Sequence, residues 1–458
     1  MSDRKLVRDG VVISMDPAIG DLDRADVLID GPRIERVARA IEVGPDVEVI
    51  DAEGCVVLPG FVDSHRHTWQ SIVRQVGSDW SLAEYFRAIR GTIGGHYRAE
   101  DLYAANLLGR VEALDAGITT MLDWSHLINS PEHADAAVSA LFDAGGRSVF
   151  AHGDGNQAWQ PVPNPPPQSA DTRRVRERWF SSDDQLVTMM TAIRGPMFTP
   201  LEVVGQDLAM ARDLDLRVTM HVGDGVRGRR RPAVELLDSR GWLGPDLTFV
   251  HCNTNTDQAM RLMSDTGATA SISPLIEMSM GHGMPATGRL LRAGVRPSLS
   301  VDVTSVSGGD LFGVMRATLA CERALDNDRR LRSGEEAGEL AISTRDVLEF
   351  ATMDGARTCG LDGRVGSLTP GKDADLIVVH PSGPHLWPLS NPVAAVVMAA
   401  QVHDVRTVLV AGEVLKRDGR VVCVDLDALR ARAQRSADHV LAMAGLDHRR
   451  FDWRVDQP

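Results

Sequence analysis

The amino-acid sequence predicts an α/β protein, a (β/α)8 TIM-like barrel with a small β-sandwich domain built from both ends of the chain. Three observations support this prediction. Short strand patterns occupy the first sixty residues and return near the C-terminus. Between them, eight apolar, β-rich runs alternate with helical patterns over roughly 250 residues, the usual length of such a barrel. Side chains that can bind a metal gather at the ends of these runs.

The first sixty residues have the pattern of short strands separated by turns. Apolar and polar side chains alternate in three segments, and Asp-Gly pairs interrupt them, which favours hairpins over helices. The same pattern returns at 374–383 and 405–422. We therefore expect residues 1–58 and 364–425 to form one composite β domain.

The middle segment, residues 59–363, contains the eight runs that predict the barrel strands. Helical patterns lie between most of them, for example at 100–117 and 201–216. A doubly wound open sheet is the alternative, but it rarely needs eight such units, and no G-x-G-x-x-G motif follows the first strand. We expect the strands to end at His67, His126, Gly153, Pro196, Asp224, Thr254, Glu277 and Thr304.

Two further segments differ from this alternation. Residues 160–178 are rich in proline and polar side chains and predict a long loop or lid between the third and fourth strands. After about Asp425 an amphipathic pattern continues to Gly445. It predicts a helical tail, 426–458, whose helix packs on the surface of the fold or at an oligomer contact.

Composition excludes several classes of function. The 458 residues carry a formal net charge of -14, which argues against nucleic acid or anionic membranes as partners. The five cysteines are far apart without a C-x-x-C pair, so neither a disulfide framework nor a zinc knuckle is indicated. The N-terminus is charged where a secretory signal has its apolar core, and no run of about 18 apolar residues occurs. We expect a cytoplasmic protein.

Histidine and aspartate side chains mark the ends of the predicted strands. His65 and His67 are two residues apart, so on an extended strand they point to the same side and can share one ion. His221 closes the fifth run, His251 the sixth and Asp302 the eighth. In a barrel these ends form the catalytic face. One such histidine is usually structural, but five such groups on one rim predict a metal site.

These motifs also carry a resemblance to a known family. The string LPGFVDSHRHTWQ, followed by His221-Val-Gly-Asp224, His251-Cys and Ser-Val-Asp302, resembles the amidohydrolase superfamily. The nearer match is its branch of chlorohydrolases and aminoheterocycle deaminases, with the atrazine chlorohydrolase, cytosine deaminase and guanine deaminase types. The likeness covers nearly the whole chain, including GSLTPGKDADLIVV near the end. The motifs are specific for the superfamily and much less so for the substrate.

The resemblance implies that His65, His67, His221 and Asp302 bind one divalent metal ion, zinc or alternatively iron. His251 would lie beside the bound water and the substrate. Such a site lowers the pKa of a water molecule toward about 7, and Asp302 could also accept its proton. The chain has only three lysines, none of them in the barrel segment, so a lysine-bridged pair of metals is not expected.

Asp224 departs from the family pattern. The deaminase branch has H-x-x-E after the fifth strand, where the glutamate moves protons, whereas this chain has aspartate. The carboxylate is then one bond, about 1.5 Å, closer to the backbone. A displacement of that order can cost about a hundredfold in rate. Either the substrate lies deeper, or another group moves the proton and Asp224 caps the next turn.

Five other residues are candidates for substrate contacts. Gln70 follows the H-x-H motif by three residues, and Trp80 lies where the branch often has an aromatic wall. His126 and His152 end the second and third strands. His282 follows the seventh strand within a methionine-rich run, and methionine walls suit flat apolar rings.

The sequence thus predicts hydrolytic deamination of an amino-substituted N-heterocycle, with His251, Asp224 and Asp302 as catalytic residues. Halide loss or opening of a cyclic amide on the same site is the alternative. A scaffold without catalysis is a remote one, because every expected ligand type is present. A nucleophilic triad is excluded by the absence of a G-x-S-x-G elbow. We expect a small-molecule substrate, no nucleic-acid or membrane partner, and a homo-oligomer.

Overall fold

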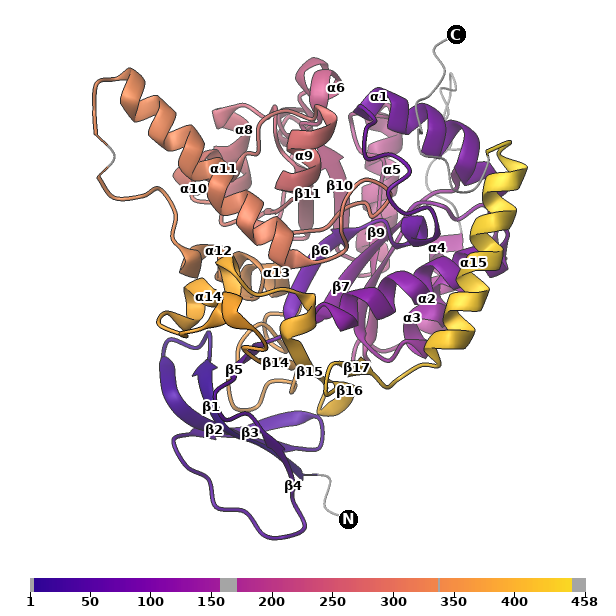
Figure 1. Cartoon of the computed structure of the whole chain (residues 1–458). Helices are drawn as coiled ribbons and strands as arrows, with labels where there is room; N and C mark the ends of the chain where they lie inside the picture. The colour runs from indigo at the N-terminus through magenta and orange to yellow at the C-terminus, as the bar shows by residue number, and fades with distance from the viewer. Residues whose placement is uncertain (1–3, 157–170, 337, 447–458) are drawn as a thin grey trace.

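The computed structural model describes residues 4–156, 171–336 and 338–446 and contains two sheets. One is an eight-stranded parallel sheet that curves into a barrel, and the other is a nine-stranded mixed sheet. The mixed sheet lies at one end of the barrel (Figure 1). The predicted fold class is confirmed.

The mixed sheet combines strands from both ends of the chain, because β5 pairs antiparallel with β14. Alternate side chains of its strands form one apolar cluster that includes Val27, Val57 and Leu376. These are the strands of the predicted composite domain, whose limits remain a prediction. The strands are β1 (Arg4–Ile13), β2 (Asp21–Asp30), β3 (Arg33–Ala38), β4 (Glu48–Asp51), β5 (Val56–Pro59), β14 (Leu376–Val379), β15 (Val405–Val410), β16 (Glu413–Arg417) and β17 (Arg420–Val421).

The barrel strands follow one another in sequence order around the sheet. Four predicted strand ends lie beyond the observed ones, at Pro196, Asp224, Thr254 and Thr304, and a fifth is wrong in kind. Glu277 does not end a strand, because Pro274 starts a helix directly after β12. The barrel strands are β6 (Phe61–Arg66), β7 (Ile118–Ser125), β8 (Arg147–His152), β9 (Val187–Ala192), β10 (Val218–Val222), β11 (Leu247–His251), β12 (Thr269–Ile272) and β13 (Ser298–Leu299).

Helices connect these strands and cover the outside of the barrel (Figure 1). They are α2 (Ala99–Asp115), α3 (Pro131–Asp143), α4 (Asp171–Trp179), α5 (Leu201–Asp213), α6 (Gly225–Arg230), α7 (Ala233–Asp238), α8 (Asp257–Thr266), α9 (Pro274–Met280), α10 (Thr287–Arg292), α11 (Leu311–Arg332), α12 (Thr344–Phe350) and α13 (Met353–Thr358). Shorter or peripheral elements are η1 (Thr68–Ile72), α1 (Leu82–Tyr85), the π-helical η2 (Phe86–Ile93), η3 (Gly94–His96), η5 (Pro384–Leu386), α14 (Pro392–Met398) and η6 (Val402–Asp404).

Two predictions concern the connecting segments. Residues 171–178 of the predicted loop are helical, within α4, while 160–170 lie outside the described residues. The predicted C-terminal helix is confirmed as α15 (Leu426–Met443), capped by Asp425 and lying beside α2 (Figure 1). In the described part of the chain, no helix combines the length and apolar character needed to cross a bilayer.

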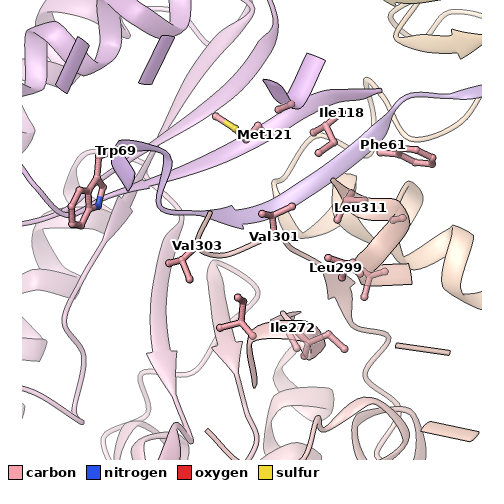
Figure 2. Close-up of a cluster of buried hydrophobic side chains, with 14 of the residues drawn as sticks. Phe61, Trp69, Ile118, Met121, Ile272, Leu299, Val301, Val303 and Leu311 are labelled. Atoms are coloured by element: carbon pink, nitrogen blue, oxygen red, sulfur yellow. The ribbon is translucent and has the colours of Figure 1, made fainter. Parts of the chain in front are cut away.

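The barrel closes between β6 and β13, where buried polar groups replace a regular ladder. An isolated parallel bridge joins Arg66 to Asp302. The backbone N–H of Val301 donates to Asp63 Oδ1 at 3.0 Å, and Asp63 lies 3.6 Å from the guanidinium of Arg66. Burial raises the pKa of Asp63 to about 6. Apolar side chains such as Phe61, Leu299 and Leu311 lie around this seam (Figure 2).

Asp63→Ala should lower the free energy of unfolding by about 2 kcal/mol, because it leaves the buried Val301 N–H without its acceptor and removes one of the two carboxylates beside Arg66, which keeps Glu112. Urea unfolding followed by circular dichroism measures the loss. Asp23→Ala is the control, since its ion pair with Arg39 is exposed and should matter by about 0.5 kcal/mol or less. Equal stability of the two variants would show that Asp63 does not hold the seam.

Candidate functional site

Five side chains from four strands meet at the carboxyl end of the barrel. His65 lies on β6, His67 directly after it, His221 on β10 and His251 at the end of β11. Asp302 follows β13, and its Oδ1 is 3.4 Å from His65 Nε2 and 3.5 Å from His67 Nε2. His65, His67 and Asp302 form one group of atoms close enough to share an ion, and His65, His221 and His251 form another.

The backbone aims Asp302 at this cluster. Its N–H donates to His65 O at 3.0 Å, and its carbonyl accepts from His67 N–H at 2.8 Å. Asp302 and His251 have φ values of 64° and 76°, in the left-handed region that residues other than glycine rarely adopt. Such strain persists where the surrounding structure holds it and is common at functional sites.

The protonation states suit metal binding. Burial lowers the pKa of His67 to about 3 and that of His221 well below its usual value, so both rings are neutral at neutral pH. His67 Nδ1 lies 3.0 Å from the carbonyl of Trp124, which as an acceptor leaves the Nε2 lone pair free to bind. Both ring nitrogens of the buried His65 have no hydrogen-bond partner among the described residues. These residues fit a divalent ion.

His251 is oriented by a carboxylate that the sequence did not single out for a role. Its Nδ1 is 3.2 Å from Oε1 of Glu277, and its Nε2 is 3.8 Å from Asp302 Oδ2. Glu277 is buried on α9 and also accepts from Ser273 N–H at 2.8 Å and Asn253 Nδ2 at 3.1 Å. Although burial alone would lower it, the pKa of His251 is raised to about 9 by Glu277 and Asp302.

Asp224 and His282 lie together on another side of the cluster. His282 Nδ1 is 2.9 Å from Asp224 Oδ1, and both side chains are buried. Burial alone would raise the pKa of Asp224, but the neighbouring His282 lowers it below its usual value. The predicted catalytic residues Asp224, His251 and Asp302 therefore face one pocket.

This pocket combines the polar cluster with apolar and aromatic walls. The apolar lining consists of Leu82, Tyr85, Phe86, Phe198, Ile276, Met280 and Val303. His67, His126, His221, His251, His282, Asp224 and Asp302 complete it. Apolar and aromatic walls around a few polar groups are typical of sites that bind a small molecule.

Two of the five predicted substrate contacts line this pocket, His126 and His282. Three do not belong to its described lining. Gln70 instead donates to the hydroxyl of Tyr85, at 2.5 Å. His152 lies 3.3 Å from the Asp171 carboxylate of α4. Trp80 is buried away from the lining.

Sequence reasoning missed Tyr85 as a wall of the pocket. The sequence predicts an aromatic wall after β6 at Trp80, whereas the aromatic side chain that lines the pocket there is the tyrosine on α1. Phe198, after β9, was missed as well and had no motif to mark it.

Comparisons with known proteins agree with this geometry. The sequence model of the Amidohydrolase family matches residues 56–415. The 5'-deoxyadenosine deaminase of Methanosarcina mazei is 27% identical over 445 residues, covering 95% of this chain and 98% of the relative. The 5-methylthioadenosine/S-adenosylhomocysteine deaminase of Syntrophobacter fumaroxidans is 28% identical over 444 residues, covering 94% and 96%.

Solved structures share the fold over nearly the whole chain. An adenosine deaminase from Xanthomonas campestris with bound zinc matches with a TM-score of 0.82 at 21% identity, covering 95% of this chain and 98% of that one. A mutant atrazine chlorohydrolase from Arthrobacter aurescens, complexed with zinc and atraton, has a TM-score of 0.83 at 21% identity, covering 94% and 100%. At this identity the likeness concerns the fold.

His67→Ala and Asp302→Ala should each remove most of the metal that the purified protein carries, because each deletes one of the proposed ligands. Metal content per chain, measured by plasma mass spectrometry, checks this. His126→Asn, which changes the pocket wall but no proposed ligand, should keep its metal. Full occupancy in both alanine variants would contradict the ligand set.

Proposed function

The chain belongs to the amidohydrolase family, and we propose that it is a metal-dependent hydrolase that deaminates an amino-substituted N-heterocycle. The observation that carries this proposal is one pocket with two parts. A cluster of histidines and Asp302 forms one part of the lining, and apolar and aromatic side chains with Asp224 and His282 form the other. Relatives named as adenosine-type deaminases support the choice of reaction.

We propose His65, His67, His221 and Asp302 as the ligands of one divalent ion, most simply zinc, with iron as the alternative. Three imidazoles and a carboxylate are a donor set that suits zinc, and they leave a position open. A bound ion would supply a Lewis acid that lowers the pKa of a water molecule toward about 7.

The other residues prepare the reacting groups. Asp302 is placed to accept a proton from the attacking water. His251, held through Nδ1 by Glu277, presents Nε2 to the same region and can donate to the oxygen as it bonds to the ring carbon. The aromatic and aliphatic walls hold the ring flat and exclude other water, which strengthens these polar interactions.

Hydrolytic dehalogenation is a second candidate on the same site. It is favoured by the aspartate at 224, since halide leaves without a proton and so needs no full-length glutamate. A cytoplasmic location and a homo-oligomeric state also remain predictions.

Zinc-loaded protein should release ammonia from at least one member of a panel of aminopurines, adenosine analogues, aminopyrimidines, pterins and aminotriazines. A chelator should abolish the release, and added zinc should restore it. An assay coupled to glutamate dehydrogenase measures the ammonia released. His67→Ala should have a kcat on the same compound that is lower by about a thousandfold or more, because the activated water is lost.

If protein with confirmed metal releases no ammonia from any compound of the panel, the proposed deamination is wrong. The matching chloro-heterocycles, assayed for chloride, then test the second candidate. Chloride release without any ammonia release would establish dehalogenation.

A further inference from the structure

A carboxylate and an imidazole form a buried pair on one side of the pocket. Asp224 Oδ1 and His282 Nδ1 are 2.9 Å apart, and the two side chains are 6% and 4% exposed. Nδ1 meets Asp224 as a close ion-pair contact without ordinary hydrogen-bond geometry, and Nε2 has no partner among the described residues. A buried imidazole that lines a pocket with one nitrogen against a carboxylate and the other without any partner points to a ligand or a reacting group.

The backbone conformation on both sides of each residue positions this pair. Asp224 lies between Gly223 and Gly225, with φ values of 63° and 54°. His282 lies between Gly281 and Gly283, with φ values of 88° and 130°. Only glycine adopts these conformations without strain, so each polar residue is flanked by the residues that its turn requires.

A backbone hydrogen bond ties the two turns together. The N–H of Gly225 donates to the carbonyl of His282 at 2.9 Å. Asn253 Nδ2 donates to the carbonyl of Met284 at 3.1 Å and so holds the same loop from the β11 side. Asp224 and His282 are therefore positioned as one unit.

The pair supplies reach that Asp224 alone lacks. Aspartate ends about 1.5 Å short of the glutamate that the family pattern has at this place. An imidazole bound to that aspartate extends the proton path by the width of a ring. His251 cannot extend the proton path of Asp224 in this way, because its Nδ1 contacts Glu277 and its Nε2 faces Asp302.

We propose that His282 Nε2 delivers the proton to the leaving nitrogen, and that Asp224 is the positioning residue that holds the ring through Nδ1. The inference rests on the proposed deamination. It makes His282 a catalytic residue and gives Asp224 a role that its shorter side chain can fulfil.

In the proposed step, water replaces the amino group of the ring. The water oxygen bonds to the ring carbon, and the carbon–nitrogen bond breaks with its electron pair remaining on nitrogen. The amino nitrogen takes the proton from His282 Nε2 and leaves as ammonia. Asp302 takes one proton from the water and releases it to solvent, and His282 regains one from solvent, so water plus the aminoheterocycle give the hydroxy-heterocycle plus ammonia.

A leaving-group comparison tests the role of His282. The substrate found with the ammonia panel and its chloro analogue share a ring, but chloride leaves without a proton. His282→Gln should lose about 100-fold or more in kcat on the amino substrate, and this loss should exceed the loss on the chloro analogue by a similar factor. Equal losses on both would show that His282 is only structural and overturn the proposal.

The coupling of the pair is tested on the amino substrate alone. Asp224→Asn should lower kcat, and the double variant with His282→Gln should be little worse than His282→Gln, because the residues act as one unit. Independent, additive losses, or wild-type rates in Asp224→Ala, would overturn the pairing. His152→Gln is the matched control, a buried histidine outside the pocket whose ratio of amino to chloro turnover should equal that of wild type.

A spectroscopic test does not depend on any substrate. The zinc-loaded protein should show a far-downfield proton signal from the Nδ1–H of His282 facing Asp224, present in His152→Gln and lost in both His282→Gln and Asp224→Asn. If the signal is absent from wild type, the pair does not exist as described and the proposal fails. If the signal is present and the panel is silent, the proposed deamination fails while the pair stands, and its role as acid is withdrawn.

Discussion

The closure of the barrel at β6 and β13 is the constraint on which the rest of the structure depends. Asp302 is fixed there by two backbone hydrogen bonds to the strand that carries His65 and His67. The atoms that complete the barrel are therefore the atoms that place the carboxylate against the imidazoles. Because these side chains lie on or directly beside strands of one sheet, the closure of the barrel fixes their relative positions, as a preorganised site requires.

The seam also explains the unusual barrel interior beside the cluster of histidines and Asp302. Barrel interiors are commonly filled by branched aliphatic side chains, but here a chain of buried hydroxyls links the strands on either side of the closure. Ser64 of β6 contacts Ser271 of β12 at 2.7 Å and accepts from Ser298 of β13 at 2.8 Å. Small side chains let short strands approach closely, and mutual hydrogen bonds avoid the cost of burying polar groups. The chain continues through Ser300 to Ser273, whose N–H holds Glu277. Packing of the seam and orientation of His251 are thus parts of one network.

Much of this could be predicted from the sequence, because two strict periodicities apply. Alternation along a strand puts His65 and His67 on one side, and the barrel rule puts strand ends on one face. Side-chain positions were predicted less well outside the strands, where these periodicities do not apply. Gln70 and Trp80 come after β6, in η1 and just before α1, where strand spacing no longer says which way a side chain points. Glu277 was assigned to a strand end because its run is apolar, although Pro274 had already started a helix. The pairing of Asp224 with His282 joins distant loops and has no local signature at all.

That pairing follows from how the pocket distributes charge. Asp224 is buried, and a lone buried carboxylate would take up a proton, yet the adjacent imidazole keeps its pKa below the usual value. An aspartate that stays ionised cannot itself donate a proton at neutral pH. In the described part of the chain, His282 contacts Asp224 and lines the pocket with an Nε2 that has no partner, so the proposed acid is this imidazole. The aspartate and the histidine opposite it therefore act as one unit in the proposed step. The shorter carboxylate makes room for the ring, and the ring restores both the reach and the acid that the carboxylate gives up.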